Sequence, residues 1–370
     1  MSAFGGVGGV GGVGGVGGVG GVGGVGGVGG VGGVGGFVGI GSFLGAEDVG
    51  GYSGAATAGL QTTADGLRHL AGQDPTQIPS NLGFDKAENM DRWATWVRGS
   101  LYVSDLLRDL NWTTDKPSKT ATLTFGGADM ISLARPAKSV LRDQCQLVRD
   151  YADLRADRTA EISSQLGFPT EYFGMILGLH MGQHKRTVEV ITATQVFAAH
   201  AAMVVKHALA VRRPDQVDGR IMPMIPTPGH GSFPSAHATE AYAVLTVLEA
   251  LVPAWDSLKD MAPRLKMLRG LAERIAVNRT VAGVHFPVDS WAGAALGTAV
   301  GRVILGRCGV TTASPSFAYT AMHCDFNDHD FVNNAASKGL TTGADYTATP
   351  SDMFVALWAK AVGESQKRGV

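Results

Sequence analysis

Side chains that could hold a tetrahedral anion lie in three segments between Lys206 and Asp289. The segments contain Lys206 and Arg213, then Ser235, Ala236 and His237, then Arg279, His285 and Asp289. Arginine offers a planar fork of hydrogen-bond donors and lysine a compact charge, and both groups suit an oxyanion. Histidine moves protons near neutral pH. This set of residues predicts an enzyme built around a bound phosphate-like anion.

Helix ends are expected to carry the first two segments. Lys206 and Arg213 are seven residues apart, so they would lie on one face of a helix that ends before Pro214. Ser235 precedes a run of good helix formers and would be the N-cap of a second helix. The amide of Ala236 would then point at the anion, since free N–H groups at a helix start bind anions.

A third helix is expected to begin at Pro287, because proline suits the first turn, and to reach about Leu305. His285 would lie just ahead of this helix. Asp289 would be within hydrogen-bonding reach of one ring nitrogen, which would fix the tautomer and present the other nitrogen to the anion.

The spacing of these residues resembles the signature shared by vanadium-dependent haloperoxidases and the type-2 phosphatidic acid phosphatase superfamily, whose pattern is K-x6-RP, then PSGH, then SR-x5-H-x3-D. The resemblance covers about the last half of the chain and is closest to a soluble member. It implies that Lys206, His237, His285 and Asp289 are catalytic. It also implies that Lys206, Arg213, Ser235, Ala236 and Arg279 bind the oxyanion.

Two positions depart from the family pattern. Ala236 stands where the family has glycine, so its amide is kept but a methyl group is added near the anion. Asn278 stands where the family has serine, and the hydroxyl of that serine is lost. These departures leave open an inactive, vestigial site.

Three functions fit these residues. The first is a vanadate-dependent haloperoxidase that oxidises bromide or iodide with hydrogen peroxide, in which His285 binds vanadium and vanadate is the cofactor. His230 favours this function, because the resemblance implies that histidine at this position accompanies bromide oxidation. The second is a soluble acid phosphatase acting on phosphomonoesters through a phosphohistidine, with phosphate in the same site. The third is a self-assembling structural or filament subunit with a vestigial site.

The N-terminal segment differs in composition from the rest. The triplet Gly-Gly-Val repeats ten times from Gly5 to Val34, and residues 1–46 carry no charged side chain. Such a tract is either a disordered tail or a segment that packs with copies of itself, which would make the protein a homo-oligomer. It lacks the basic and compact apolar regions of a secretory signal. The compartment therefore stays open: cytoplasmic by default, extracellular if filamentous.

The remaining sequence predicts one large domain. Residues 47–90 are expected to be linker and loop, and residues 91–370 an all-α catalytic domain, a helical bundle of the haloperoxidase and acid phosphatase type. Helical spacing of apolar residues marks residues 91–110 and 139–166. The longest uncharged run near the site has sixteen residues, 190–205, which is too short for a membrane span.

The balance of charges excludes one class of partner. The chain has 370 residues, a net charge of −1 and 45% hydrophobic residues, enough for a substantial core. It has no basic surface pattern for nucleic acid. Its three cysteines lie in no metal-ligand spacing. The expected partners are therefore small molecules: halide and peroxide, or a phosphomonoester.

Overall fold

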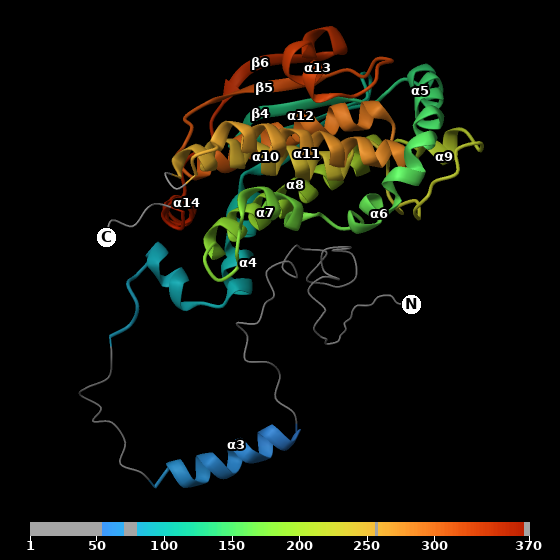
Figure 1. The fold of residues 1–370 in the computed structure, drawn as a ribbon. Coiled ribbons are helices and arrows are strands. Elements are labelled where there is room, and N and C mark those ends of the chain that lie inside the picture. Colours follow the sequence, from blue (N-terminus) through green and yellow to red (C-terminus); the bar gives the residue numbers. More distant parts are fainter. Residues whose placement is uncertain (1–53, 70–79, 256–257, 366–370) are drawn as a thin grey trace.

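The computed structural model describes residues 54–69, 80–255 and 258–365 (Figure 1). The Gly-Gly-Val tract in residues 1–46 lies outside these ranges, so its packing or disorder stays a prediction. Residues 47–90, expected to be linker and loop, include the helix α3 (Gly54–Leu67) and the start of the 3-10 helix η3 (Ala87–Arg92). Helices make up most of the described chain, and a small mixed sheet accompanies them.

The longer helices come mainly from the middle of the chain. They are α4 (Thr95–Arg108), α5 (Lys138–Asp150), α6 (Arg155–Ser164), α7 (Thr170–Leu177), α8 (Lys185–Leu209), α10 (Ala236–Leu251), α11 (Met261–Val281), α12 (Pro287–Arg307) and α14 (Asp352–Gly363). Shorter helices are η4 (Tyr151–Leu154), α9 (Pro214–Val217), η5 (Val252–Ala254), α13 (Asp328–Asn333) and η6 (Ala335–Lys338).

Helix α12 forms the centre of the core. Nearly all of its residues are buried, because its sequence is apolar or small on every face. It packs against α10, α8 and α11 on one side and against the sheet on the other (Figure 1). The residues at its N-terminal end are therefore held by contacts on all sides.

Small residues bring α10 and α12 close together. A Cβ atom at Gly293 would lie 2.6 Å from the carbonyl oxygen of Ser235, and one at Gly297 would lie 2.3 Å from that of Thr239. Both glycines lie on one face of α12, four residues apart. The close approach places the N-terminal ends of the two helices side by side, and Ser235 N donates to Asp289 O at 2.9 Å.

A five-stranded sheet makes the expectation of an all-α domain wrong. Its strands are β2 (Leu110–Asp115), β3 (Thr120–Phe125), β4 (Ala128–Ala134), β5 (Ser314–Tyr319) and β6 (Leu340–Tyr346), in this order. Strands β4 and β5 are parallel, with Ile131 opposite Phe317, and the other pairs are antiparallel. Strand β3 buries alternate residues, as a half-buried strand does. The pairing of β4 with β5 joins segments about 180 residues apart, which no local pattern indicates.

Two helix predictions also need correction. The region 139–166 is not one helix, because the 3-10 helix η4 separates α5 from α6. Lys206 and Arg213 do not share a helix either. Helix α8 ends at Leu209, since Ala210 adopts a left-handed conformation (φ 47°), and Arg213 is the N-cap of α9.

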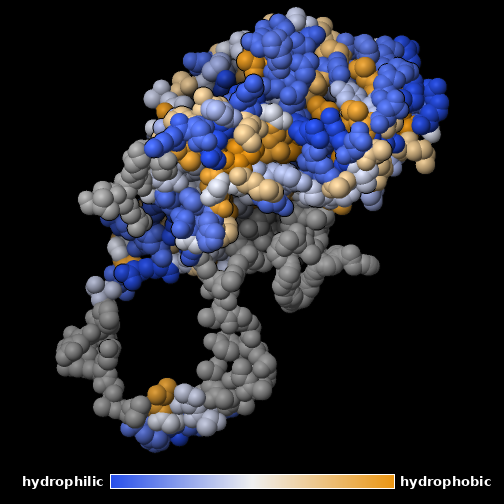
Figure 2. Space-filling model, in the orientation of Figure 1, coloured by the Kyte–Doolittle hydropathy of each residue, from blue (hydrophilic) through white to orange (hydrophobic). Residues whose placement is uncertain are grey.

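One stretch, Lys185–Val217, is long and apolar enough to cross a membrane, so the expectation based on uncharged run length is wrong on this point. Of its most apolar window, 67% is buried inside the structure, as in the core helix of a globular protein. Figure 2 shows an apolar area on one face of the helical body, with hydrophilic surface around it. In this structure, most of the apolar part of this stretch therefore packs in the core.

Candidate active site

Lys206 holds the loop that precedes α10. It lies in the last turn of α8 and is 2% exposed. Its Nζ atom donates to the carbonyl oxygens of Gly231 (2.8 Å) and Ser232 (2.9 Å). Burial and the charge of Arg213 lower its pKa well below the ordinary lysine value. A bound anion would favour the charged form again.

Arg213 joins this loop to His285. Its Nε donates to the carbonyl oxygen of His230 (3.0 Å) and its Nη1 to that of Val284 (2.7 Å). Nη1 also donates to His285 Nε2 at 2.9 Å, and Nη2 donates to His230 Nδ1 at 3.1 Å. Burial lowers the pKa of Arg213 to about 10, so it remains charged at neutral pH.

His285, Asp289 and Ser232 form a buried chain of hydrogen bonds. His285 Nδ1 lies 2.8 Å from Asp289 Oδ2, the contact that their spacing predicted. The same oxygen accepts from Ser232 Oγ (2.5 Å) and from the amide of Phe286 (3.0 Å). Burial, Arg213 and Lys206 lower the pKa of His285 well below its ordinary value. His285 is therefore neutral, with its proton on Nδ1 and its lone pair on Nε2.

Ser235 begins α10, where its spacing placed it. Its backbone has extended dihedrals, and its Oγ accepts from Ala238 N at 3.4 Å, a long N-cap contact. The hydroxyl proton is left for another acceptor. Ala236, the first residue of the helix, is buried beside it. The helix start thus faces the N-terminal end of α12.

His237 and Arg279 meet at Gln165, the C-cap residue of α6. His237 Nε2 lies 2.8 Å from the carbonyl oxygen of Gln165, and Arg279 Nη1 donates to the same oxygen at 3.2 Å. Arg279 Nη2 donates to Gln165 Oε1 at 3.0 Å. Burial and then Arg279 lower the pKa of His237 to about 3, and burial lowers that of Arg279 to about 10.

Among the described residues, no carboxylate accepts a hydrogen bond from the cations of the site, although the charge of Asp289 acts on Lys206 and Arg213. Five lysine or arginine side chains are buried in the part of the chain that the structure describes. Arg98 pairs with Glu189 at 2.5 Å, and Arg307 pairs with Asp105 and Asp109. Lys206, Arg213 and Arg279 donate only to neutral groups within the described residues. Buried cations that donate to no carboxylate indicate a site that receives an anion.

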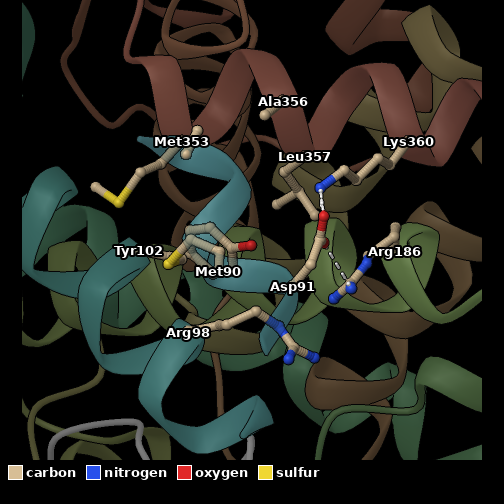
Figure 3. A pocket seen from close by; sticks show the side chains of 10 residues that line it. Met90, Asp91, Arg98, Tyr102, Arg186, Met353, Ala356, Leu357 and Lys360 are labelled. Atoms are coloured by element: carbon tan, nitrogen blue, oxygen red, sulfur yellow. Dashed lines mark hydrogen bonds and ion pairs between the residues drawn. The ribbon is translucent and has the colours of Figure 1, made fainter. Parts of the chain in front are cut away.

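A pocket elsewhere shows the opposite arrangement (Figure 3). In it, Asp91 lies between Lys360, at 2.7 Å, and Arg186, at 3.1 Å. These charges compensate one another across the pocket. Each cation that lines it, Arg98, Arg186 and Lys360, pairs with a carboxylate, either Asp91 or Glu189, unlike the three cations of the site.

The structure brings together all the residues that the sequence singled out. The charges of Arg213 and Lys206 act on His285, and that of Arg279 acts on His237. Two further residues, Ser232 and Gln165, were missed. Each contacts the predicted site residues across 50 or more positions, and neither stands in a recognisable motif. Ser232 lies three positions before Ser235, which was its only local link to the predicted site, and Gln165 had none.

Comparisons with known proteins give a family for the segment that carries Lys206 to Asp289. The family model of the PAP2 superfamily matches residues 188–307. A decaprenylphosphoryl-5-phosphoribose phosphatase from Mycobacterium tuberculosis (strain CDC 1551 / Oshkosh) is 31% identical over 130 residues, 35% of this chain and 66% of the relative. The protein of the same name from Mycolicibacterium smegmatis is 38% identical over 108 residues, 28% of this chain and 52% of the relative. The chain thus spans between half and two thirds of these relatives, and its residues 188–307 form a PAP2 superfamily domain.

Proposed function

We propose that this protein is a phosphatase that hydrolyses phosphomonoesters through a phosphohistidine at His285. The observation that carries the proposal is the set of three buried cations, Lys206, Arg213 and Arg279, that donate only to neutral groups. A phosphoryl group would supply the missing negative charge. In the transition state the charge of the transferring group is spread over its three equatorial oxygens, and these donors would stabilise it.

His285 is the nucleophile in this mechanism. Its Nδ1–H donates to Asp289, so the Nε2 lone pair would attack phosphorus and the bond to the leaving oxygen would break. In this structure the lone pair accepts from Arg213 Nη1. A phosphoryl oxygen would take over that donor, which frees Nε2 and places Arg213 on the anion. Water would then attack the phosphohistidine and release phosphate.

His237 supplies and later removes a proton. As the leaving alkoxide departs it needs one proton, and the attacking water must lose one. The pKa of His237 is about 3 without ligand, so the ring is neutral at pH 7. A phosphomonoester dianion beside the ring would raise this pKa and favour the imidazolium. The leaving oxygen would replace the carbonyl of Gln165 as the acceptor from Nε2.

The comparisons support the phosphatase over the haloperoxidase. The relatives are named as phosphatases, and none of them supports halide oxidation. His230, which favoured bromide oxidation, accepts from Arg213 and thereby helps to orient this arginine. The same oxyanion site fits vanadate, whose role as a cofactor stays a prediction. Vanadate is useful here as an analogue of the phosphoryl transition state.

Hydrolysis of an aryl phosphate tests the proposal. We expect release of phosphate that orthovanadate inhibits, and an acid-labile phosphoenzyme after rapid quenching with labelled substrate. His285→Ala should abolish both, while Lys360→Ala, at the pocket of Figure 3, should leave both unchanged. A second substrate arm would use a phosphorylated prenylphosphoryl ribose, as the relatives' name suggests. Peroxide-dependent bromide oxidation without hydrolysis would refute the proposal, and absence of both activities would favour a vestigial site.

A further inference from the structure

Gln165 enters the site from outside the matched family region. It follows α6, which ends at Ser164, whereas the family match begins at residue 188. The side chain is fully buried. Its Oε1 accepts from Arg279 Nη2 (3.0 Å) and from Asn278 Nδ2 (3.0 Å), and its main-chain oxygen accepts from Arg279 Nη1 (3.2 Å). One residue therefore engages both terminal nitrogens of the arginine.

The third nitrogen of this guanidinium is free. Arg279 Nε is buried and has no hydrogen-bond partner among the described residues. Guanidinium donors form a rigid fork, so fixing the two terminal nitrogens also fixes the direction of Nε–H. An unsatisfied buried donor costs free energy unless a ligand accepts from it. The arrangement thus presents one edge of Arg279 to an incoming oxygen while Gln165 holds the other.

The chemistry of the holding group matters. Gln165 orients Arg279 with two neutral oxygens, so its terminal nitrogens form no ion pair. The carboxylate nearby, Glu161, is engaged by Arg274 (2.7 Å) and by Asn278 (2.7 Å). A carboxylate at position 165 would instead form an ion pair with Arg279 and compete with the anion.

Asn278 fits this arrangement. It stands where the family pattern has serine, and its amide donates to Gln165 Oε1 and to Glu161 Oε1. Its Oδ1 accepts from Arg158 Nη1 on α6 at 3.1 Å. The longer asparagine side chain thereby links α11 to α6. Asparagine in place of serine at position 278 is thus explained by its contacts with Gln165 and with α6.

We infer that Gln165 is a positioning residue that aims Arg279 at the bound oxyanion while leaving its charge available. This inference rests on the proposed function for its role in hydrolysis but can be tested through anion binding alone. It predicts an order of affinities among three side chains at this position. Glutamine should bind the anion best, methionine less well because it cannot accept hydrogen bonds, and glutamate least because it neutralises Arg279.

The test measures orthovanadate binding by calorimetry and aryl phosphate hydrolysis for the wild type, Gln165→Met and Gln165→Glu. Gln165→Met keeps the volume and removes the acceptor. We expect its orthovanadate Kd to rise about tenfold and its kcat/KM to fall about tenfold, as loss of one oriented charged hydrogen bond implies. Gln165→Glu should lose more. Ser163→Ala, at an exposed position on α6, is the matched control and should behave as wild type.

The outcomes separate this inference from the proposed function. If Gln165→Met binds orthovanadate within twofold of wild type, the inference is wrong whatever the hydrolysis rate. The inference also fails if Gln165→Glu binds orthovanadate more tightly than Gln165→Met does. That order of affinities is expected if Gln165 holds Arg279 only for structural reasons, because glutamate can still accept its hydrogen bonds. Wild-type protein that binds orthovanadate but hydrolyses nothing would overturn the proposed function alone. Wild-type protein that binds no orthovanadate would overturn both.

Discussion

Replacing Arg279 with methionine should make the protein more stable and inactive. The pKa of Arg279 is lowered by burial from 12.5 to about 10. At 1.36 kcal/mol per pH unit, the buried charge costs about 3 kcal/mol of folding free energy. The sign is clear, because a depressed arginine pKa means that the charged form is disfavoured in the fold. The full cost therefore applies below pH 10 and disappears only above 12.5.

Arg279→Met leaves both oxygens of Gln165 with a hydrogen-bond donor. Gln165 O keeps the bond from His237, and Gln165 Oε1 keeps the bond from Asn278. We therefore expect Arg279→Met to gain about 1–3 kcal/mol in unfolding free energy, since exchanging buried charge for a well-packed apolar side chain is neutral or stabilising. For a protein of this size each kcal/mol raises Tm by about 1–2 °C. Activity should fall by a factor of about 100–1000, as for loss of one oxyanion donor.

The same substitution at Arg307 is the matched control. Arg307 is equally buried, but it pairs with Asp105 and Asp109. Arg307→Met should lose about 3–5 kcal/mol because it leaves buried carboxylate uncompensated. Denaturant unfolding followed by circular dichroism measures both variants. If Arg279→Met is destabilised by more than about 1 kcal/mol, Arg279 is a structural residue and the reasoning about uncompensated charge is refuted.

Three further outcomes follow from the packing and the hydrogen bonds. Ser232→Ala removes a bond to the buried Asp289 carboxylate and should lower kcat about tenfold, with partial rescue by threonine; unchanged kcat would rule out this role. Gly297→Ala puts a methyl group against Thr239 O and should destabilise the fold by about 1–3 kcal/mol in urea unfolding, whereas wild-type stability would show that α10 and α12 can separate without cost. Burial raises the pKa of Glu240 from 4.5 to about 8, so stability should decline as pH rises from 4.5 through 8, and Glu240→Gln should flatten this dependence; an equal decline in both proteins would contradict the assignment.

Much of the site could be predicted from local sequence. Pro287 begins α12, Ser235 caps α10, and His285 contacts Asp289 four residues on. These features depend on backbone rules that act within one helical turn. Spacing within a helix start is therefore a reliable guide to which side chains can meet.

The rest depended on contacts between distant segments. Arg213 was placed on the same helix as Lys206, but the left-handed Ala210 ends that helix four residues after Lys206. The strands β5 and β6 pair with a sheet that begins near residue 110. Local periodicity does not indicate pairing over that distance, and it therefore predicted a domain made of helices alone. Gln165 reaches Arg279 across 114 positions. Local patterns cannot indicate such pairings, because only tertiary packing selects them.

The most direct test of the central claim is a crystal structure of the protein with orthovanadate bound. The three buried cations and His285 are expected to surround one oxyanion. The account predicts vanadium bonded to His285 Nε2, with its oxygens accepting hydrogen bonds from Lys206, Arg213 and Arg279. Vanadate bound elsewhere, or a well-ordered site in which these side chains keep their internal partners at saturating vanadate, would contradict it.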